Sequence, residues 1–94
     1  MLVRCTLLGQ AKEVAGADGA EVELAAGATV EDLLGRLAAI YGPAFARTVR
    51  REDGRLAYEL AILVGNRNVS LTSGLATPLR EGDVVTILPV IAGG

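Results

Sequence analysis

The chain has 94 residues, 51% of them hydrophobic, and carries a formal net charge of −2 with a pI of about 5.0. This length predicts a single domain with a modest core, and the acidic balance argues against general nucleic-acid binding, which needs a basic surface. With no His and one Cys, the chain lacks the residues for a common zinc site or for a Ser–His or Cys–His nucleophile pair, so we expect no catalysis by the chain alone.

The first third of the chain predicts two strands separated by a short helix or turn. Apolar and polar residues alternate over residues 2–9 and again over 21–24, which is the pattern of strands with one buried face. Residues 11–15 predict the intervening helix or turn. The side chains expected to point inward are Val3, Cys5, Leu7, Val22 and Leu24.

The clearest predicted element is a helix that begins after Thr29. Thr29 is a good N-cap, and Asp32 three residues later completes a start that resembles a capping box. Gly42 and Pro43 supply the expected stop. The apolar residues that recur at helical spacing are Val30, Leu33, Leu34, Leu37, Ala38 and Tyr41.

The second half of the chain predicts one short helix and further strands. Residues 44–49 are expected to form the helix, and the apolar runs 60–64 and 84–88 are typical of buried strands. Residues 65–68 predict a turn that leads into a short extra strand at 69–71.

The single cysteine and a group of arginines are candidate functional residues, but both are better explained as structural features. Cys5 has the inward phase of its strand, so we expect a buried and unreactive thiol. A group of arginines is interrupted by acidic residues and has no interleaved aromatics, so we interpret it as a solvated loop face. These arginines are Arg47, Arg50, Arg51 and Arg55.

Together the elements predict an α+β domain over residues 1–88 and a flexible Gly-Gly tail over 89–94. A helix with one apolar stripe must cross one face of a sheet to bury it. Placing the first and last strands side by side as central parallel strands gives a β-grasp arrangement, a mixed sheet of four to five strands with one main helix. The expected core consists of Val3, Cys5, Leu7, Val22, Leu24, Val30, Leu33, Leu34, Leu37, Ile62, Val64, Val85 and Ile87.

The chain ends in the apolar segment Leu88-Pro89-Val90-Ile91-Ala92-Gly93-Gly94. Two successive glycines make a thin, bendable thread that fits a narrow channel. The α-carboxylate at its end is a poor electrophile until it is activated, for example as an acyl-adenylate, and it can then become a thiocarboxylate or join an amine. A frayed terminus is the alternative explanation.

Three segments of this chain form a recognisable combination. They are Thr29 to Leu34 at the helix start, Leu79 to Val85 before the last strand, and Leu88 to Gly94 at the end. The last two belong to the pattern G-x-x-T-P-L-x-x-G-D-x-V-x-I-x-P-x-x-A-G-G over residues 74–94. With these features the chain resembles the ubiquitin-like sulfur carriers, the family of the molybdopterin synthase small subunit and the thiamine sulfur carrier. The resemblance covers essentially the whole chain and implies the ubiquitin-like β-grasp fold.

The resemblance also implies a mechanism. An adenylating enzyme of the ubiquitin-activating type would use ATP to convert the Gly94 carboxylate to an acyl-adenylate, and sulfur from a persulfide would replace AMP. The resulting thiocarboxylate would donate sulfur, with Gly93 giving clearance in the partner's channel. The acceptor would be a synthase subunit, so the chain would be the small subunit of a sulfurtransferase such as molybdopterin synthase, in molybdenum cofactor biosynthesis.

The resemblance assigns further residues to partner binding. These are Leu8, Leu88, Pro89, Val90, Ile91 and Ala92. Pro89 is also expected to stiffen the root of the tail through its fixed φ. We expect no bound cofactor and no metal, since ATP is used by the partner enzyme. No apolar run approaches the roughly 18 residues of a membrane span, and no signal-peptide pattern is present, so a cytoplasmic protein without a membrane or nucleic-acid partner is expected.

Other functions stay open at this point. The run Ile87–Val90 lacks the aromatic residue and two prolines that usually precede the tail of the molybdopterin subunits, and Gly42–Tyr58 is longer than in the smallest of them. Both features, with Ser73–Thr77, look similar to the sulfur-carrier branch that serves cysteine synthesis, so the sulfur would go to cysteine, or to thiamine, instead. A ubiquitin-like protein modifier uses the same activation but ends in an isopeptide bond to lysine. A non-covalent adaptor would carry an idle tail.

Overall fold

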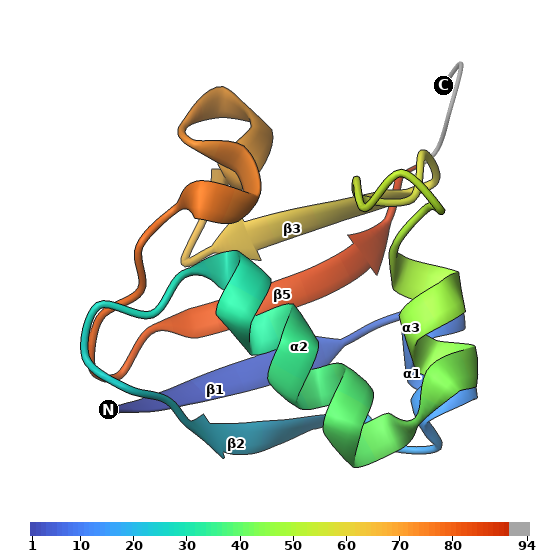
Figure 1. Ribbon diagram of the computed structural model, residues 1–94, viewed down its shortest axis with the longest axis horizontal. Helices are drawn as coiled ribbons and strands as arrows, with labels where there is room; N and C mark the ends of the chain where they lie inside the picture. The colour runs from blue at the N-terminus through green and yellow to red at the C-terminus, as the bar shows by residue number, and fades with distance from the viewer. Residues whose placement is uncertain (91–94) are drawn as a thin grey trace.

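The computed structural model describes residues 1–90, which form one mixed sheet crossed on one face by a helix (Figure 1). The elements are β1 (Leu2–Leu7), α1 (Gln10–Ala15), β2 (Gly19–Glu23), α2 (Val30–Tyr41), α3 (Pro43–Val49), β3 (Leu60–Val64), β4 (Arg67–Asn68), the 3-10 helices η1 (Val69–Leu71) and η2 (Gly74–Ala76), and β5 (Val84–Pro89). None of the helices within residues 1–90 is long and apolar enough to span a membrane.

The strands lie in the order β2-β1-β5-β3-β4, which confirms the predicted β-grasp arrangement. β1 and β5 are central and parallel, with Cys5 opposite Val85 and Leu7 opposite Ile87. β2 pairs with β1, and β3 pairs with β5, both in the antiparallel sense. The strands from the two ends of the sequence therefore form the middle of the sheet, and both finish at the same edge of the domain (Figure 1).

Helix α2 begins and ends where the sequence predicts. The Thr29 side chain accepts a hydrogen bond from the Asp32 backbone N–H, and an Asp32 carboxylate oxygen accepts one from the Thr29 N–H at 2.9 Å, so the capping box is complete. Gly42 follows the helix with φ of 97°, and its N–H donates to the Ala38 carbonyl at 2.8 Å. Glycine tolerates this positive φ without the strain that a Cβ would bring.

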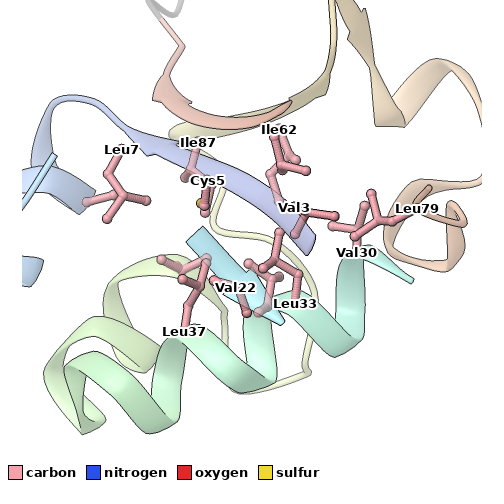
Figure 2. Packing of buried hydrophobic residues seen from close by; sticks show 14 of the residues in the cluster. Val3, Cys5, Leu7, Val22, Val30, Leu33, Leu37, Ile62, Leu79 and Ile87 are labelled. Atoms are coloured by element: carbon pink, nitrogen blue, oxygen red, sulfur yellow. The ribbon is translucent and has the colours of Figure 1, made fainter. Parts of the chain in front are cut away.

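The core lies between α2 and the sheet. Figure 2 shows Leu33 and Leu37 pointing from α2 toward the strands, and both side chains are 0% exposed. Every predicted core residue is buried except Val64, which is only partly buried. The patterns missed buried residues that come mostly from short helices and loops, where too few residues repeat to show a period. They are Ala11, Ala28, Phe45, Val49, Ala57, Leu60, Val69 and Leu79.

The short strand predicted at residues 69–71 is wrong. Val69–Leu71 form the 3-10 helix η1, and the extra strand is β4, inside the predicted turn. The cause is Asn68, whose side-chain oxygen accepts a hydrogen bond from the Ser70 N–H at 2.9 Å. Such a bond caps the start of a helical turn and competes with strand pairing.

Several strand boundaries also differ from the prediction. β1 ends at Leu7, before the predicted residue 9, because Gly9 adopts φ of 62° and turns the chain into α1. β2 begins at Gly19, before the predicted residue 21, because Gly19 pairs with Thr6. β5 continues through Pro89, beyond the predicted end at Leu88.

The arginine group is not a uniformly solvated face. Arg50 donates to the Gly54 carbonyl from Nε at 2.9 Å and to the Glu31 carboxylate at 2.8 Å, which ties the loop after α3 to α2. The Arg51 guanidinium lies 3.9 Å from the ring centroid of Tyr58. Two of the four arginines therefore have structural contacts, and the local sequence pattern does not reveal the contact with Glu31 because it lies 19 positions from Arg50.

Candidate functional site at the tail-bearing edge

The edge at which β1 and β5 both finish carries the C-terminal segment. The Leu8 N–H donates to the Ile87 carbonyl at 2.9 Å, and the Val90 N–H donates to the Glu59 carbonyl at 2.8 Å. The main chain therefore stays hydrogen-bonded to the sheet as far as Val90, the last described residue. The predicted site residues Ile91, Ala92, Gly93 and Gly94 lie outside the described residues. The predicted division at residue 88 stays a prediction.

Pro89 is accommodated at this edge because β1 has already turned away. A proline in a central strand normally loses a ladder hydrogen bond. Here the chain leaves the ladder at Gly9, and a Cβ built on Gly9 would come within 2.9 Å of Pro89 Cγ. Gly9 also has φ of 62°, so both its conformation and its neighbour require glycine. The root of the C-terminal segment thus packs on the turn between β1 and α1, a contact that sequence reasoning missed.

The predicted partner-binding leucines lie next to each other at this edge. We call Leu8, Ala61, Leu88 and Val90 the exit patch. Leu88 pairs with Ala61 across β3 and β5, and the parallel register that places Leu7 beside Ile87 brings Leu8 alongside Leu88. Leu8 and Val90 are 42% and 48% exposed. The even-numbered residues of β5 face away from α2, so the exit patch lies on the sheet face opposite this helix.

A further exposed side chain borders the same edge. Tyr58 is 81% exposed, although an aromatic ring usually gains stability from burial. Tyr58 immediately precedes Glu59, whose carbonyl accepts the hydrogen bond from the Val90 N–H. The Arg51 guanidinium lies over the Tyr58 ring. The position of Tyr58 could not be predicted from the sequence, because a single tyrosine in a loop is not part of a helix or strand period.

The described residues offer little chemistry of their own at this edge. Within residues 1–90, no group of three or more His, Cys, Asp or Glu side chains is arranged to hold a metal ion. The chemically distinctive side chain is Cys5, which is 1% exposed, and its inward position confirms the predicted strand phase. Burial removes the thiolate from water and raises the pKa of Cys5 from 9.0 to about 12.

This raised pKa predicts a loss of stability at alkaline pH. Below pH 9 the thiol is protonated in both the folded and the unfolded chain, so its contribution is fully present. Between pH 9 and about 12 only the unfolded chain releases the proton, and stability falls as pH rises. The slope should be about 1.4 kcal/mol per pH unit. We expect chemical denaturation from pH 8 to 11 to give this extra slope relative to Cys5→Ala, and parallel curves for the two proteins would contradict it.

Comparison with known proteins identifies relatives of this chain. The model of the ThiS family matches residues 5–94. A candidate sulfur carrier protein of Archaeoglobus fulgidus is 41% identical over 66 residues, which cover 70% of this chain and 74% of that protein. Small archaeal modifier protein 3 of Haloferax volcanii is 39% identical over 67 residues, which cover 71% of each.

Solved structures are similar over nearly the whole fold. The crystal structure of SAMP1 from Haloferax volcanii has a TM-score of 0.84 and 26% identity, and the similarity covers 100% of both chains. A chain from the crystal structure of the BexX/CysO complex of Amycolatopsis orientalis has a TM-score of 0.74 and 29% identity, covering 98% of this chain and 99% of that one. These similarities support the β-grasp assignment made from the strand order.

Proposed function

Because the chain belongs to the ThiS family of ubiquitin-like sulfur carriers, we propose that its C-terminal carboxylate is adenylated and converted to a thiocarboxylate that donates sulfur. The observation that carries this proposal is the placement of the C-terminal segment. The central strand β5 leads directly to it, and the sheet holds it through Val90. The four residues that follow span at most about 14 Å, enough to carry a terminal carbonyl into a partner's cleft.

The reaction needs no catalytic side chain from the carrier. A carboxylate oxygen of Gly94 attacks the α-phosphorus of ATP, and pyrophosphate leaves. A persulfide sulfur of the partner system then attacks the acyl carbon, the C–O bond breaks and AMP leaves. A second thiol reduces the S–S bond of the acyl persulfide and leaves the thiocarboxylate on Gly94. The carrier contributes the carbonyl, the C-terminal segment that presents it and a docking surface, while its partners contribute the acid–base groups.

The exit patch is suited to dock these partners. Exposed apolar residues mark interaction surfaces when they cluster, and the exposed Leu8 and Val90 lie beside the partly buried Leu88 here. An adenylating enzyme and a sulfur-accepting synthase subunit would use this surface in turn. A partner docked on this surface would have a fixed position relative to Val90. That position limits where the terminal carbonyl, four residues further on, can reach.

The molybdopterin precursor is the first candidate acceptor, because the chain resembles the molybdopterin synthase small subunit, although the run Ile87–Val90 lacks the aromatic residue and two prolines usual there. Cysteine synthesis is a second candidate acceptor, which the similarity of segments Gly42–Tyr58 and Ser73–Thr77 to that branch favours. Thiamine synthesis is the third. Supplying the purified thiocarboxylate to each synthase with its acceptor, and measuring sulfur-labelled product, distinguishes the three.

Mass spectrometry of the chain isolated from its own cells tests the carrier function. We expect a population heavier by the difference between one sulfur and one oxygen, located on Gly94. A second candidate function, protein modification, is favoured by the 39% identity to small archaeal modifier protein 3. That function would instead leave Gly94 joined to lysines of other proteins. Cells that contain neither species would contradict both.

Charge placed in the exit patch should impair docking without unfolding the domain. We expect Leu8→Arg to weaken binding to the cognate adenylating enzyme at least about tenfold, since an apolar contact is lost and a cation is desolvated. Its free energy of unfolding should change by no more than about 0.5 kcal/mol, because Leu8 is already 42% exposed. Ile40→Arg is the matched control, since Ile40 is 48% exposed but lies on α2. Equal binding by the two variants would place the docking surface elsewhere.

A further inference from the structure

A short turn at the start of β3 holds the main chain where the C-terminal segment leaves the sheet. We call residues 57–60 the anchor turn, which lies between α3 and β3 beside the end of β5 (Figure 1). The Leu60 N–H closes it by donating to the Ala57 carbonyl at 3.1 Å, and the Glu59 carbonyl accepts from the Val90 N–H at 2.8 Å. The direction in which Val90 points therefore depends on where the anchor turn places the Glu59 carbonyl.

The middle of the anchor turn has little backbone support. Its first residue, Ala57, is fixed because its N–H donates to the Val49 carbonyl at 2.8 Å. Within residues 1–90, however, neither the Tyr58 N–H nor the Glu59 N–H donates a backbone hydrogen bond. A side-chain contact of Tyr58 is therefore needed to restrain the peptide that carries the Glu59 carbonyl.

Arg51 makes this contact with the Tyr58 ring. Its guanidinium carbon lies 3.9 Å from the ring centroid, and its side chain is only 21% exposed. The guanidinium also lies 3.3 Å from an Asp53 carboxylate oxygen, and Nε is buried without a hydrogen-bond partner within residues 1–90. A cation is attracted to the negative face of an aromatic ring more strongly when water is excluded from the cation. Arg51 therefore restrains a ring that is otherwise exposed to solvent.

The main chain that carries Arg51 is itself fixed by hydrogen bonds. The Arg51 N–H donates to the Arg55 carbonyl at 2.7 Å, and the Arg51 carbonyl accepts from the Gly54 N–H at 2.9 Å. The preceding residue, Arg50, is tied to α2 by its 2.8 Å hydrogen bond to Glu31. The Arg51 guanidinium is therefore attached to a fixed part of the domain, against which the anchor turn can be held.

We propose that Arg51 and Tyr58 are positioning residues, whose cation–π contact holds the anchor turn and, through the Glu59 carbonyl, the main chain at Val90. Neither residue takes part in the chemistry. Their effect on adenylation rests on the proposed function, whereas their hold on Val90 is a property of the free chain. With this contact in place, the main chain leaves the domain from one fixed point, so a partner docked on the exit patch meets the C-terminal segment at one place.

Amide hydrogen exchange of the free full-length chain, followed by NMR, measures the hold on Val90. We expect Arg51→Met and Tyr58→Ala each to speed exchange of the Val90 N–H about fivefold, the factor that corresponds to a cation–π contact of ordinary strength. Tyr58→Phe keeps the ring face and should restore slow exchange. Arg55→Met is the matched control, because it removes the same charge from an exposed residue of the same loop, and none of the ion pairs within residues 1–90 involves Arg55.

Two further measurements show whether the two side chains act as a pair and whether their effect is local. The double variant Arg51→Met/Tyr58→Ala should exchange Val90 no faster than Tyr58→Ala alone, since both changes remove the same contact. The N–H groups of Leu8 and Ala57, which are also hydrogen-bonded, should keep their wild-type rates. Additive effects at Val90, or equal acceleration at Ala57, would overturn the proposal, because the variants would then be loosening the loop as a whole.

ATP–pyrophosphate exchange with the cognate adenylating enzyme measures the consequence for the proposed function. We expect Arg51→Met to lower kcat about tenfold while binding to the enzyme stays within about twofold, since the exit patch is intact and a small misplacement of the reacting carbonyl is costly.

Each measurement can contradict the proposal. Unchanged exchange of the Val90 N–H in Arg51→Met would overturn the hold on Val90, and unchanged kcat despite faster exchange would overturn the positioning role. If the wild-type chain itself supports no pyrophosphate exchange, the proposed function fails, while amide exchange still decides whether Arg51 and Tyr58 hold Val90.

Discussion

Adding one alanine after Gly94 is expected to lower adenylation of the chain by about a hundredfold or more. The extra residue moves the reacting carbon by about 3.5 Å, and a misplacement of only 1 Å can cost about a hundredfold in rate. Because the main chain is hydrogen-bonded to the domain as far as Val90, the point from which the C-terminal segment leaves is fixed. An enzyme docked on the exit patch, as proposed above, would lose that contact if it shifted the domain to compensate for the extra residue.

The measurement is ATP–pyrophosphate exchange with the cognate adenylating enzyme. Gly93→Val is a second variant that should fail, because its branched Cβ would enter a channel sized for glycine. Unfolding curves of both variants, compared with the wild type, check that a loss of exchange does not come from a loss of folding. Near-normal exchange by the extended chain would refute the thiocarboxylate mechanism and favour a non-covalent adaptor.

Leu34→Ala is expected to destabilise the domain by roughly 2–5 kcal/mol. Leu34 is 3% exposed on the face of α2 that packs on the sheet, so truncation removes buried methyl groups and leaves a cavity. A domain of this length has a total stability of about 5–14 kcal/mol. The single change should therefore remove a large share of it.

Ile40→Ala provides the control from the same helix. Ile40 is 48% exposed, so the same kind of truncation should cost much less than at Leu34. Chemical denaturation of both variants and the wild type measures the difference. A loss below about 1 kcal/mol for Leu34→Ala would mean that the helix face was assigned wrongly.

The elements that the sequence predicted well depend on local signals. Helix α2 has its cap, its apolar period and its glycine stop within a few consecutive residues, and the structure contains all three. The strand faces of β1 and β5 follow from the alternation of side chains, which is a property of each strand alone. The failure at residues 69–71 has a local cause as well, because the Asn68 cap outweighed the alternation of the apolar residues Val69 and Leu71 with Ser70.

Some parts of the candidate site could likewise be identified from local sequence, and others could not. The terminal glycines and the apolar residues Leu8 and Leu88 were identified from the sequence, with the family resemblance assigning their roles. The contact between Gly9 and Pro89 was not identified. It depends on the parallel pairing of β1 with β5, which brings together residues from opposite ends of the chain.

The sequence by itself determined which residues prefer helix or strand, which side of each element is apolar, and that the given chain ends in an apolar segment with two glycines. Only the tertiary structure decided what lies beside the root of the C-terminal segment: the turn at Gly9, the exit patch and the exposed Tyr58. The physical reason is that periodicity and capping act over a few residues, whereas these neighbours are set by hydrogen bonds and packing between distant strands.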